Sequence, residues 1–317
     1  DSNTRVLSWL PHYHDMGLIG GILQPLFVGG EAFLMSPVSF LQNPSRWLTA
    51  VSDYQITISG GPNFAFDLCN QKISDDQISE LDLSTWKVAF NGAEAIQAKT
   101  LDTFLAKFEV AGFSSDAFFP CYGLAEATLL VSGAKRGNAV TNIELDAKAL
   151  ENGKIQTAGT QASIRLAASG LMLSPSEVRI VNSDTKSVSD KDLVGEICIA
   201  SDCVTRGYWD SPELNDECFI KLDSDRSFFR TGDLGFIRDG LLYVTGRIKD
   251  LIIIKGRNIY PHDVEDTVLT ASQWIRERSC AAFSIVDDGK ELLVVVAELS
   301  PKLKAEDEIR NVAIRVM

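Results

Sequence analysis

Several short polar segments of the 317-residue sequence carry side chains that could bind a charged ligand. In the segment YGLAEAT at residues 122–128, Tyr122 offers a flat face to a base, and Glu126 could hold Mg²⁺ through its carboxylate oxygens. The same segment could simply start a helix, with Glu126 near the positive end of the helix dipole. Strand-to-helix turns with an acidic residue are common, so both interpretations stay open on this motif alone.

A second acidic residue and a group of cations follow later in the chain. Asp233, in RTGDLG at residues 230–235, could accept hydrogen bonds from both hydroxyls of a ribose, as acidic residues do in other nucleotide sites. Gly-Asp is also good turn chemistry, so a plain polar turn is the alternative. Residues 246–261 surround an apolar strand with cations, which could equally form a solvated strand edge that resists aggregation. These cations are Arg247, Lys249, Lys255 and Arg257.

The segment HYHDMG at residues 12–17 first suggests a metal site, because two imidazoles and a carboxylate are adjacent. A tetrahedral site needs a further ligand, and His262 is the only other histidine of the sequence. The six cysteines are scattered and form no CxxC motif, so zinc is not indicated. We therefore expect a turn with a functional His14, and reduced thiols in a cytoplasmic protein.

Composition narrows the class of protein. Hydrophobic residues make up 45% and charged residues 23%, as in an ordinary globular chain. With 43 acidic and 30 basic residues the formal charge is −13, so a broad basic face for nucleic acid is not expected. The length suggests one large unit plus at least part of a second.

Apolar patterns indicate the elements that must position these residues. Residues 6–132 alternate short apolar runs with helical periodicity, which predicts a layered α/β unit. Two of its expected strands, WKVAF and DAFFPC, run directly into NGAE at residues 91–94 and into YGLAEAT. Loops at the carboxyl ends of strands are where open α/β sheets bind ligands. The placement therefore favours a binding site at this sheet edge.

Two amphipathic helices are expected in this unit. Asn43 and Pro44 stand where the N-cap and first residue of a helix belong, and Gly112 would end the second helix. The buried faces are expected to be Trp47, Leu48, Val51 and Tyr54 in the first, and Leu101, Phe104, Leu105 and Phe108 in the second.

The domain organisation follows from changes in pattern. We expect residues 1–162 to be the α/β part of a large domain, 163–248 a β-rich subdomain of short strands, and 249–317 a small α+β domain ending in a helical run. The polar, weakly patterned residues 138–159 predict an insertion or a long surface connection. No signal peptide or transmembrane segment is expected, since the longest apolar stretch is short and contains Pro25. Both ends look cut.

The order HDMGL, NGAE, YGLAEAT, RTGDLG and GRIKD resembles the adenylate-forming superfamily of acyl-CoA synthetases, nonribosomal-peptide adenylation domains and luciferases. Longer strings, including LPHYHDMGLIGGILQPLFVGG, FFPCYGLAEATLLVSG and IIIKGRNIYPHDVED, are similar to the fatty acyl-AMP ligase branch in particular. The resemblance extends from about residue 6 to 299. It implies a layered α/β large domain with a β-rich subdomain, and a small α+β domain.

The resemblance also implies roles for individual residues. Tyr122 and the adjoining Gly123 would lie against adenine, Glu126 would be the Mg²⁺ ligand, and Asp233 would bind the ribose. The base edge would face the backbone of Asn91, Gly92, Ala93 and Glu94. Arg247 would contact ribose or phosphate, Lys249 would occupy the hinge of the small domain, and His14 would lie near the acyl carboxylate and the phosphopantetheine entry. Part of the acyl pocket wall would be Ser59, Gly60, Gly61 and Pro62.

By the same resemblance, ATP and Mg²⁺ would serve to convert a fatty acid to acyl-adenylate and pyrophosphate. The acceptor would be an acyl carrier protein, or a carrier domain of a polyketide or nonribosomal peptide synthase. Residues 138–159 stand where this branch carries an insertion that ties down the small domain and is associated with poor use of coenzyme A. The alternatives are a fatty acyl-CoA ligase and a noncatalytic nucleotide- or acyl-binding module. A serine hydrolase is disfavoured, because the sequence has no GxSxG.

Two motifs of the family are not in these 317 residues. Its Ser/Thr/Gly-rich phosphate loop precedes HDMGL, and its catalytic lysine lies near the end of the small domain, beyond Met317. We therefore expect this chain by itself to make little or no acyl-adenylate.

Overall fold

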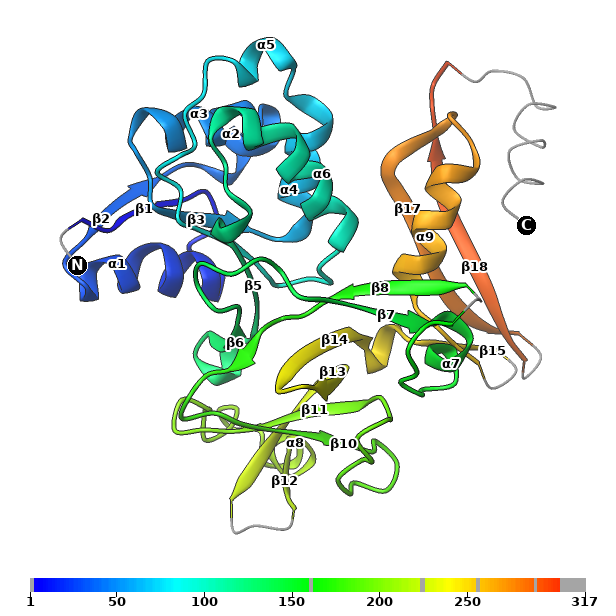
Figure 1. Ribbon diagram of the computed structural model, residues 1–317. Coiled ribbons are helices and arrows are strands. Elements are labelled where there is room, and N and C mark those ends of the chain that lie inside the picture. The colour runs from blue at the N-terminus through cyan, green and yellow to red at the C-terminus, as the bar shows by residue number, and fades with distance from the viewer. Residues whose placement is uncertain (1–2, 160–161, 223–225, 255–256, 288–289, 303–317) are drawn as a thin grey trace.

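The computed structural model describes residues 3–159, 162–222, 226–254, 257–287 and 290–302. Within these ranges a twelve-stranded sheet joins a parallel half to an antiparallel half (Figure 1). The parallel strands are short, and all but the edge strand Glu31–Leu34 are largely buried, as expected where helices cover a sheet. In spatial order they are β2 (Glu31–Leu34), β1 (Arg5–Ser8), β3 (Ile58–Gly61), β4 (Val88–Asn91) and β5 (Phe118–Gly123).

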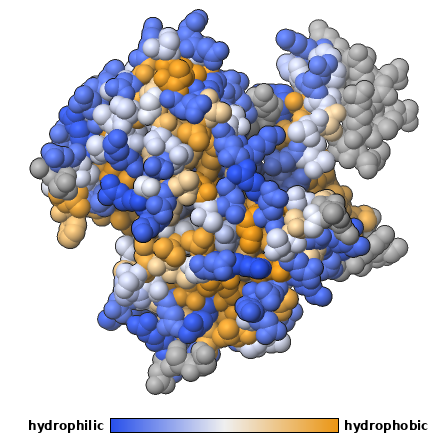
Figure 2. Space-filling model, in the orientation of Figure 1, coloured by the Kyte–Doolittle hydropathy of each residue, from blue (hydrophilic) through white to orange (hydrophobic). Residues whose placement is uncertain are grey.

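The antiparallel half continues from β5 through six further strands, and a short strand pairs with one of them. In spatial order these are β6 (Leu130–Gly133), β9 (Leu171–Met172), β14 (Leu241–Arg247), β13 (Ser227–Arg238), β11 (Gly195–Ala200) and β10 (Glu177–Val181), with β12 (Phe219–Lys221) beside β13. Helix α8 (Pro212–Cys218) precedes β12. Figure 2 shows the molecule from the same side as Figure 1, with hydrophobic residues gathered in the middle of the view, over these strands.

Helices gather on one side of the parallel strands, and α1 (Gln24–Phe27) lies on the other (Figure 1). Between the helical layer and the sheet lies an aromatic core that includes Trp47, Phe104 and Phe118. Those helices are α2 (Pro37–Gln42), α3 (Ser45–Asp53), α4 (Asn63–Lys72), α5 (Asp75–Ile78) and α6 (Ala98–Phe108).

The two predicted helices correspond to α3 and α6. Helix α3 begins at Ser45 with Pro44 at the N-cap, one residue later than predicted, and the Asn43 side chain accepts hydrogen bonds from the Ser45 backbone N–H and hydroxyl. Tyr54, expected on the buried face, is half exposed just beyond the helix end. Gly112 adopts a left-handed conformation with φ of 84° after a 3₁₀ turn, which confirms it as the stop of the second helix.

Residues 138–159, expected to be an insertion or a surface connection, contain regular structure. Strand β7 (Asn142–Asp146) leads into α7 (Ala147–Glu151) and pairs antiparallel with β8 (Ser163–Ala167). Leu145 and Leu150 are buried in one cluster with Phe236 and Tyr260, so this segment shares a core with later parts of the chain. The predicted boundary at residue 162 therefore falls inside a paired hairpin.

The last described elements form a small α+β unit. The hairpin of β15 (Ile252–Ile254) and β16 (Arg257–Ile259) leads into α9 (Pro261–Ala271), which packs on β17 (Ile275–Asp287) and β18 (Lys290–Leu299). The helical run expected at the chain end lies outside the described residues. No helix in the described part of the chain is long and apolar enough to cross a membrane. The predicted α/β fold class is confirmed.

Candidate active site

A cavity of about 560 Å³ lies between the π-helix Met16–Leu23 and the parallel strands β3 to β5. Side chains alternate between the faces of a strand, so every second residue points into it. On β4, Val88 and Phe90 line the cavity while Ala89 joins the aromatic core. On β5, Phe119 lines it while Phe118 joins that core. Other apolar lining residues are Ile58, Cys121, Leu129 and Leu130.

The other end of the cavity is polar and lies where β4 and β5 terminate. Gly92 and Ala93 line it after β4, and Glu126 lines it after β5. Ala93 has a φ of 70°, a conformation that costs energy for a residue with a side chain and is typical of functional sites. Arg247 is the single Lys or Arg among the described residues that line the cavity, which His14 also borders. The sheet edge predicted from NGAE and YGLAEAT is thus the polar end of a cavity.

Glu126 is presented by a strained turn instead of an α-helix. A 3₁₀ turn, Ala125–Ala127, follows β5 and leads to β6. Thr128 then adopts φ 71° and ψ −59°, and the Leu129 N–H donates to the Ala127 carbonyl at 2.9 Å. This is a γ-turn of the rare, strained kind. The helix-start interpretation of YGLAEAT is therefore wrong.

Tyr122, Asp233 and Arg247 meet beside this turn. The Tyr122 hydroxyl donates to Asp233 Oδ2 at 2.7 Å, and Arg247 Nε donates to Asp233 Oδ1 at 2.9 Å. The backbone dictates the second contact, because Asp233 and Arg247 are directly opposite each other on β13 and β14. Residues separated by 111 positions in the sequence are thus joined by one hydrogen bond.

The Asp233 carboxylate is buried, with 6% of the residue exposed. Burial raises its pKa above the usual 3.8, although the hydrogen bond from Tyr122 and the charge of Arg247 act in the opposite direction. Burial, and after it the Asp233 charge, raise the pKa of Tyr122 well above its usual value. Tyr122 therefore remains a protonated donor.

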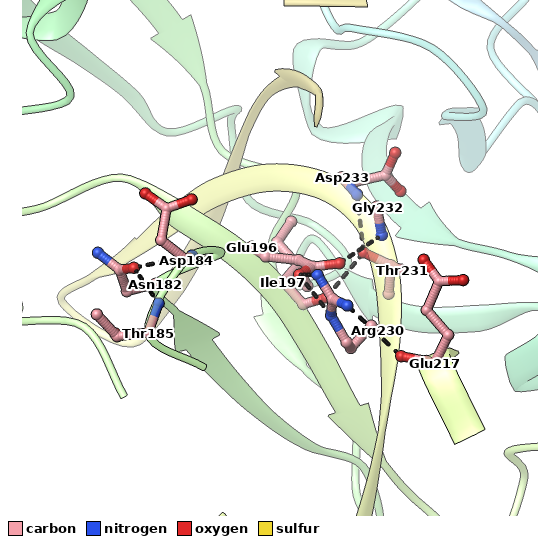
Figure 3. A network of polar contacts seen from close by, with 10 residues as sticks. All are labelled: Asn182, Asp184, Thr185, Glu196, Ile197, Glu217, Arg230, Thr231, Gly232 and Asp233. Carbon is pink, nitrogen blue, oxygen red and sulfur yellow. Dashed lines mark hydrogen bonds and ion pairs between the residues drawn. The ribbon is translucent and has the colours of Figure 1, made fainter. Parts of the chain in front are cut away.

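A polar network holds the bend of β13 that presents Asp233 (Figure 3). Arg230 Nε donates to Glu196 Oε2 at 2.9 Å, and the Gly232 N–H donates to Glu196 Oε1 at 3.2 Å. The Thr231 hydroxyl donates to the Ile197 carbonyl and accepts from the Asp233 N–H at 3.1 Å. RTGDLG therefore lies within a long bent strand, and the plain-turn interpretation is wrong.

Tyr122 and Asp233 lie outside the cavity lining, as do several other predicted site residues. Asn91 is fully buried at the end of β4, Glu94 accepts from the Phe64 N–H, and Lys249 is exposed in a 3₁₀ turn between β14 and β15. Ser59 faces the aromatic core, where its hydroxyl donates to the Leu7 carbonyl and accepts from Trp47. The cavity is lined by Ile58 but by none of the four residues that follow it, Ser59, Gly60, Gly61 and Pro62.

Sequence reasoning missed two groups of residues. Val88, Phe90, Phe119 and Cys121 line the cavity, and the alternation within WKVAF and DAFFPC could have indicated them. Tyr208, which donates to Glu126 Oε1 at 2.5 Å, carries no comparable local signal.

Residues 1–209 match the family model described as AMP-binding enzyme. The match covers well over half of the chain, which therefore belongs to the AMP-binding enzyme family. The chain is also similar to the medium-chain-fatty-acid–acyl-carrier-protein ligase JamA of Moorena producens, with 41% identity over 98% of this chain and 54% of that protein.

Two solved structures of fatty acyl-adenylate ligases are similar as well. One, from L. pneumophila in complex with acyl adenylate and pyrophosphate, has 42% identity and a TM-score of 0.78 over 100% of this chain and 56% of that chain. The other, from a study of the E. coli and L. pneumophila enzymes, has 35% identity and a TM-score of 0.88. The match covers 99% of this chain and 56% of that chain. The resemblance to fatty acyl-AMP ligases is confirmed. The chain spans about half the length of the curated relatives it matches.

Proposed function

We propose that a full-length protein carrying this sequence uses ATP to convert a fatty acid to acyl-adenylate and pyrophosphate. The acyl group then passes to the phosphopantetheine thiol of an acyl carrier protein, or of a carrier domain in a polyketide or nonribosomal peptide synthase. The observation that carries the proposal is the cluster of Tyr122, Asp233 and Arg247, of which Arg247 lines the same cavity as Glu126. The name of the relative JamA supports the carrier protein as acceptor.

Asp233 is suited to bind the ribose. An ionised carboxylate offers about four acceptor positions, and Tyr122 and Arg247 use one on each oxygen. The remaining positions can accept both ribose hydroxyls. The two donors already present fix the carboxylate before the nucleotide arrives, so little further ordering is needed on binding.

The reaction brings two anions together, because a carboxylate attacks the α-phosphate. Alignment and charge neutralisation are therefore the main requirements. Arg247 supplies positive charge in the cavity lining, and its side chain is 67% exposed and so able to reach a ligand. We assign His14, also in the lining, to the acyl carboxylate and the thiol entry, and Lys249 to the hinge of the small domain.

Mg²⁺ is the metal that this reaction implies. The described residues contain no group of three or more His, Cys, Asp or Glu side chains able to hold a metal. Glu126 lines the cavity, and within the described ranges its Oε2 has no hydrogen-bond partner. Mg²⁺ is usually held by one or two carboxylates together with substrate phosphates and several waters, so the residues fit a metal that enters with ATP. When bound, Mg²⁺ would neutralise phosphate charge.

The apolar end of the cavity would take the fatty acyl chain. Its walls come from Ile58, Val88, Phe90 and Phe119, which carry no hydrogen-bonding side-chain groups. The segment 59–62 remains a predicted part of the wall that the position of this cavity does not support. We place the enzyme in the cytoplasm, where free cysteines such as those described here stay reduced.

The decisive experiment supplies the full-length protein with laurate and ATP, and with either coenzyme A or a holo carrier protein. We expect laurate-dependent pyrophosphate release and acyl transfer to the carrier protein. Efficient acyl-CoA formation would favour a fatty acyl-CoA ligase, and the absence of adenylate would favour a noncatalytic binding module. Asp233→Ala should weaken ATP binding by removing charge-assisted hydrogen bonds, and an unchanged affinity would contradict the ribose assignment.

The 317-residue chain by itself should release little or no pyrophosphate with fatty acid and ATP. Two motifs of the family, the phosphate loop and the catalytic lysine, are not among its residues. Robust fatty-acid-dependent release by the purified chain would refute this expectation.

A further inference from the structure

Glu126 has a partner that the motifs do not indicate. Tyr208 lies 82 residues further along the chain, in the segment between β11 and α8, and its hydroxyl donates to Glu126 Oε1 at 2.5 Å. Tyr208 does not line the cavity, whereas Glu126 does. The hydroxyl therefore contacts the carboxylate from behind the cavity wall.

The backbone of Tyr208 is fixed from two sides. Its N–H donates to Asn215 Oδ1 at 2.7 Å, and Asn215 Nδ2 donates to its carbonyl at 2.9 Å. The preceding Gly207 has a φ of 147°, and a Cβ there would lie 2.8 Å from the Asn215 side chain. The ring packs edge-on against Phe229, with 6.5 Å between the centroids. A hydroxyl held this firmly can orient the group that it contacts.

We propose that Tyr208 is a positioning residue that fixes the Glu126 carboxylate, so that one oxygen is occupied by the hydroxyl and the other is free to bind the metal. The inference rests on the proposed function. A neutral donor suits this task, because it orients the carboxylate without cancelling the negative charge that attracts Mg²⁺. A Lys or Arg in the same place would compete with the metal. Groups that hydrogen-bond to metal ligands commonly tune metal affinity in this way.

The hydroxyl is not required to hold the two segments together. The Thr205 N–H donates to the Glu126 carbonyl at 2.7 Å, and the Thr128 hydroxyl donates to the Cys203 carbonyl at 2.8 Å. These bonds tie the same turn to the same segment and do not touch the carboxylate. Thr128→Val and Tyr208→Phe each remove one hydrogen bond between the turn and this segment. Thr128→Val, however, leaves the hydrogen bond between Tyr208 and the Glu126 carboxylate unchanged.

The test compares wild type, Tyr208→Phe and Thr128→Val in the full-length protein. Electron paramagnetic resonance measures Mn²⁺ binding in the presence of a nonhydrolysable ATP analogue. The Mg²⁺ dependence of adenylate formation and the thermal midpoint are measured alongside. We expect Tyr208→Phe to bind Mn²⁺ roughly ten- to a hundredfold more weakly. Its half-saturating Mg²⁺ concentration should rise while saturating Mg²⁺ restores most of the rate.

Thr128→Val should bind Mn²⁺ as wild type does, with at most a small loss in thermal midpoint. Equal Mn²⁺ affinity in wild type and Tyr208→Phe would overturn the inference and leave the proposed function intact. An equal loss in both variants would also overturn it, because the effect would then be structural. Wild type that binds no metal–nucleotide and forms no adenylate would overturn the proposed function and this inference together.

Discussion

The two halves of the large sheet contribute to the candidate site in different ways. The parallel half supplies apolar lining from alternating positions on β4 and β5, backed by an aromatic core. The antiparallel half supplies Asp233 and Arg247, placed by strand register and by the network around Glu196. The apolar end depends on local strand periodicity and general packing. The cluster around Asp233 depends on specific pairs of residues from different parts of the sequence.

The largest expected effect is in the helical layer that covers the parallel half. Phe104 is fully buried, so Phe104→Ala should lower the free energy of unfolding by about 4 kcal/mol through lost burial and the cavity left behind. Chemical denaturation measures this. Val110→Ala is the control, since Val110 is 82% exposed and should change stability by less than about 0.5 kcal/mol. Similar losses in both variants would contradict the assigned core. The ring neighbours of Phe104 are Phe66, Trp86, Phe108, Phe113 and Phe118.

The next effect concerns the network behind Asp233. Glu196 is 2% exposed, and Glu196→Ala would leave the largely buried Arg230 without its partner, at a cost of about 3 kcal/mol in unfolding free energy. The matched control is Glu177→Ala, because Glu177 forms an ion pair with Arg179 near the surface. This variant should lower the unfolding free energy by less than about 1 kcal/mol. If the control loses as much stability as Glu196→Ala, burial of the ion pair is not what stabilises the bend.

Asp233→Asn should separate binding from stability. Loss of the charge should weaken ATP binding by about tenfold in calorimetry, since hydrogen bonds to charged groups are the stronger ones. The raised pKa means that ionisation of Asp233 opposes folding. The stability that the protonated Asp233 carboxyl contributes is fully present below the unfolded pKa of 3.8. It is lost as the pH rises through the folded pKa.

The Asn variant should therefore gain stability relative to wild type as the pH rises from about 3.8 to 7. Denaturation at both ends of this range measures the difference. A relative loss with rising pH would show that the ion pair with Arg247 outweighs desolvation.

The smallest expected effect is a difference in reactivity between two cysteine thiols, Cys121 in the cavity wall and Cys203 outside it. Burial raises the pKa of Cys121 to about 12, so little thiolate is present at pH 8. Cys203 is exposed. Mass spectrometry after a short iodoacetamide treatment should find Cys203 alkylated and Cys121 intact. Labelling of Cys121 as fast as Cys203 would mean that the apolar end is open to solvent.

Local sequence patterns predicted several of the elements. The strands WKVAF and DAFFPC and the helix stop at Gly112 were readable because each depends on neighbouring residues. The motif order likewise indicated the family.

Tertiary structure decided which side chains meet. A shift of one residue along a strand reverses the face, which is why Ile58 lines the cavity while Ser59 points into the aromatic core. The contact between Tyr208 and Glu126 depends on how a loop and a turn pack, and the facing of Asp233 and Arg247 depends on the register of two strands. Such contacts between distant residues leave no periodic trace in the sequence, because they arise only when the whole sheet is assembled.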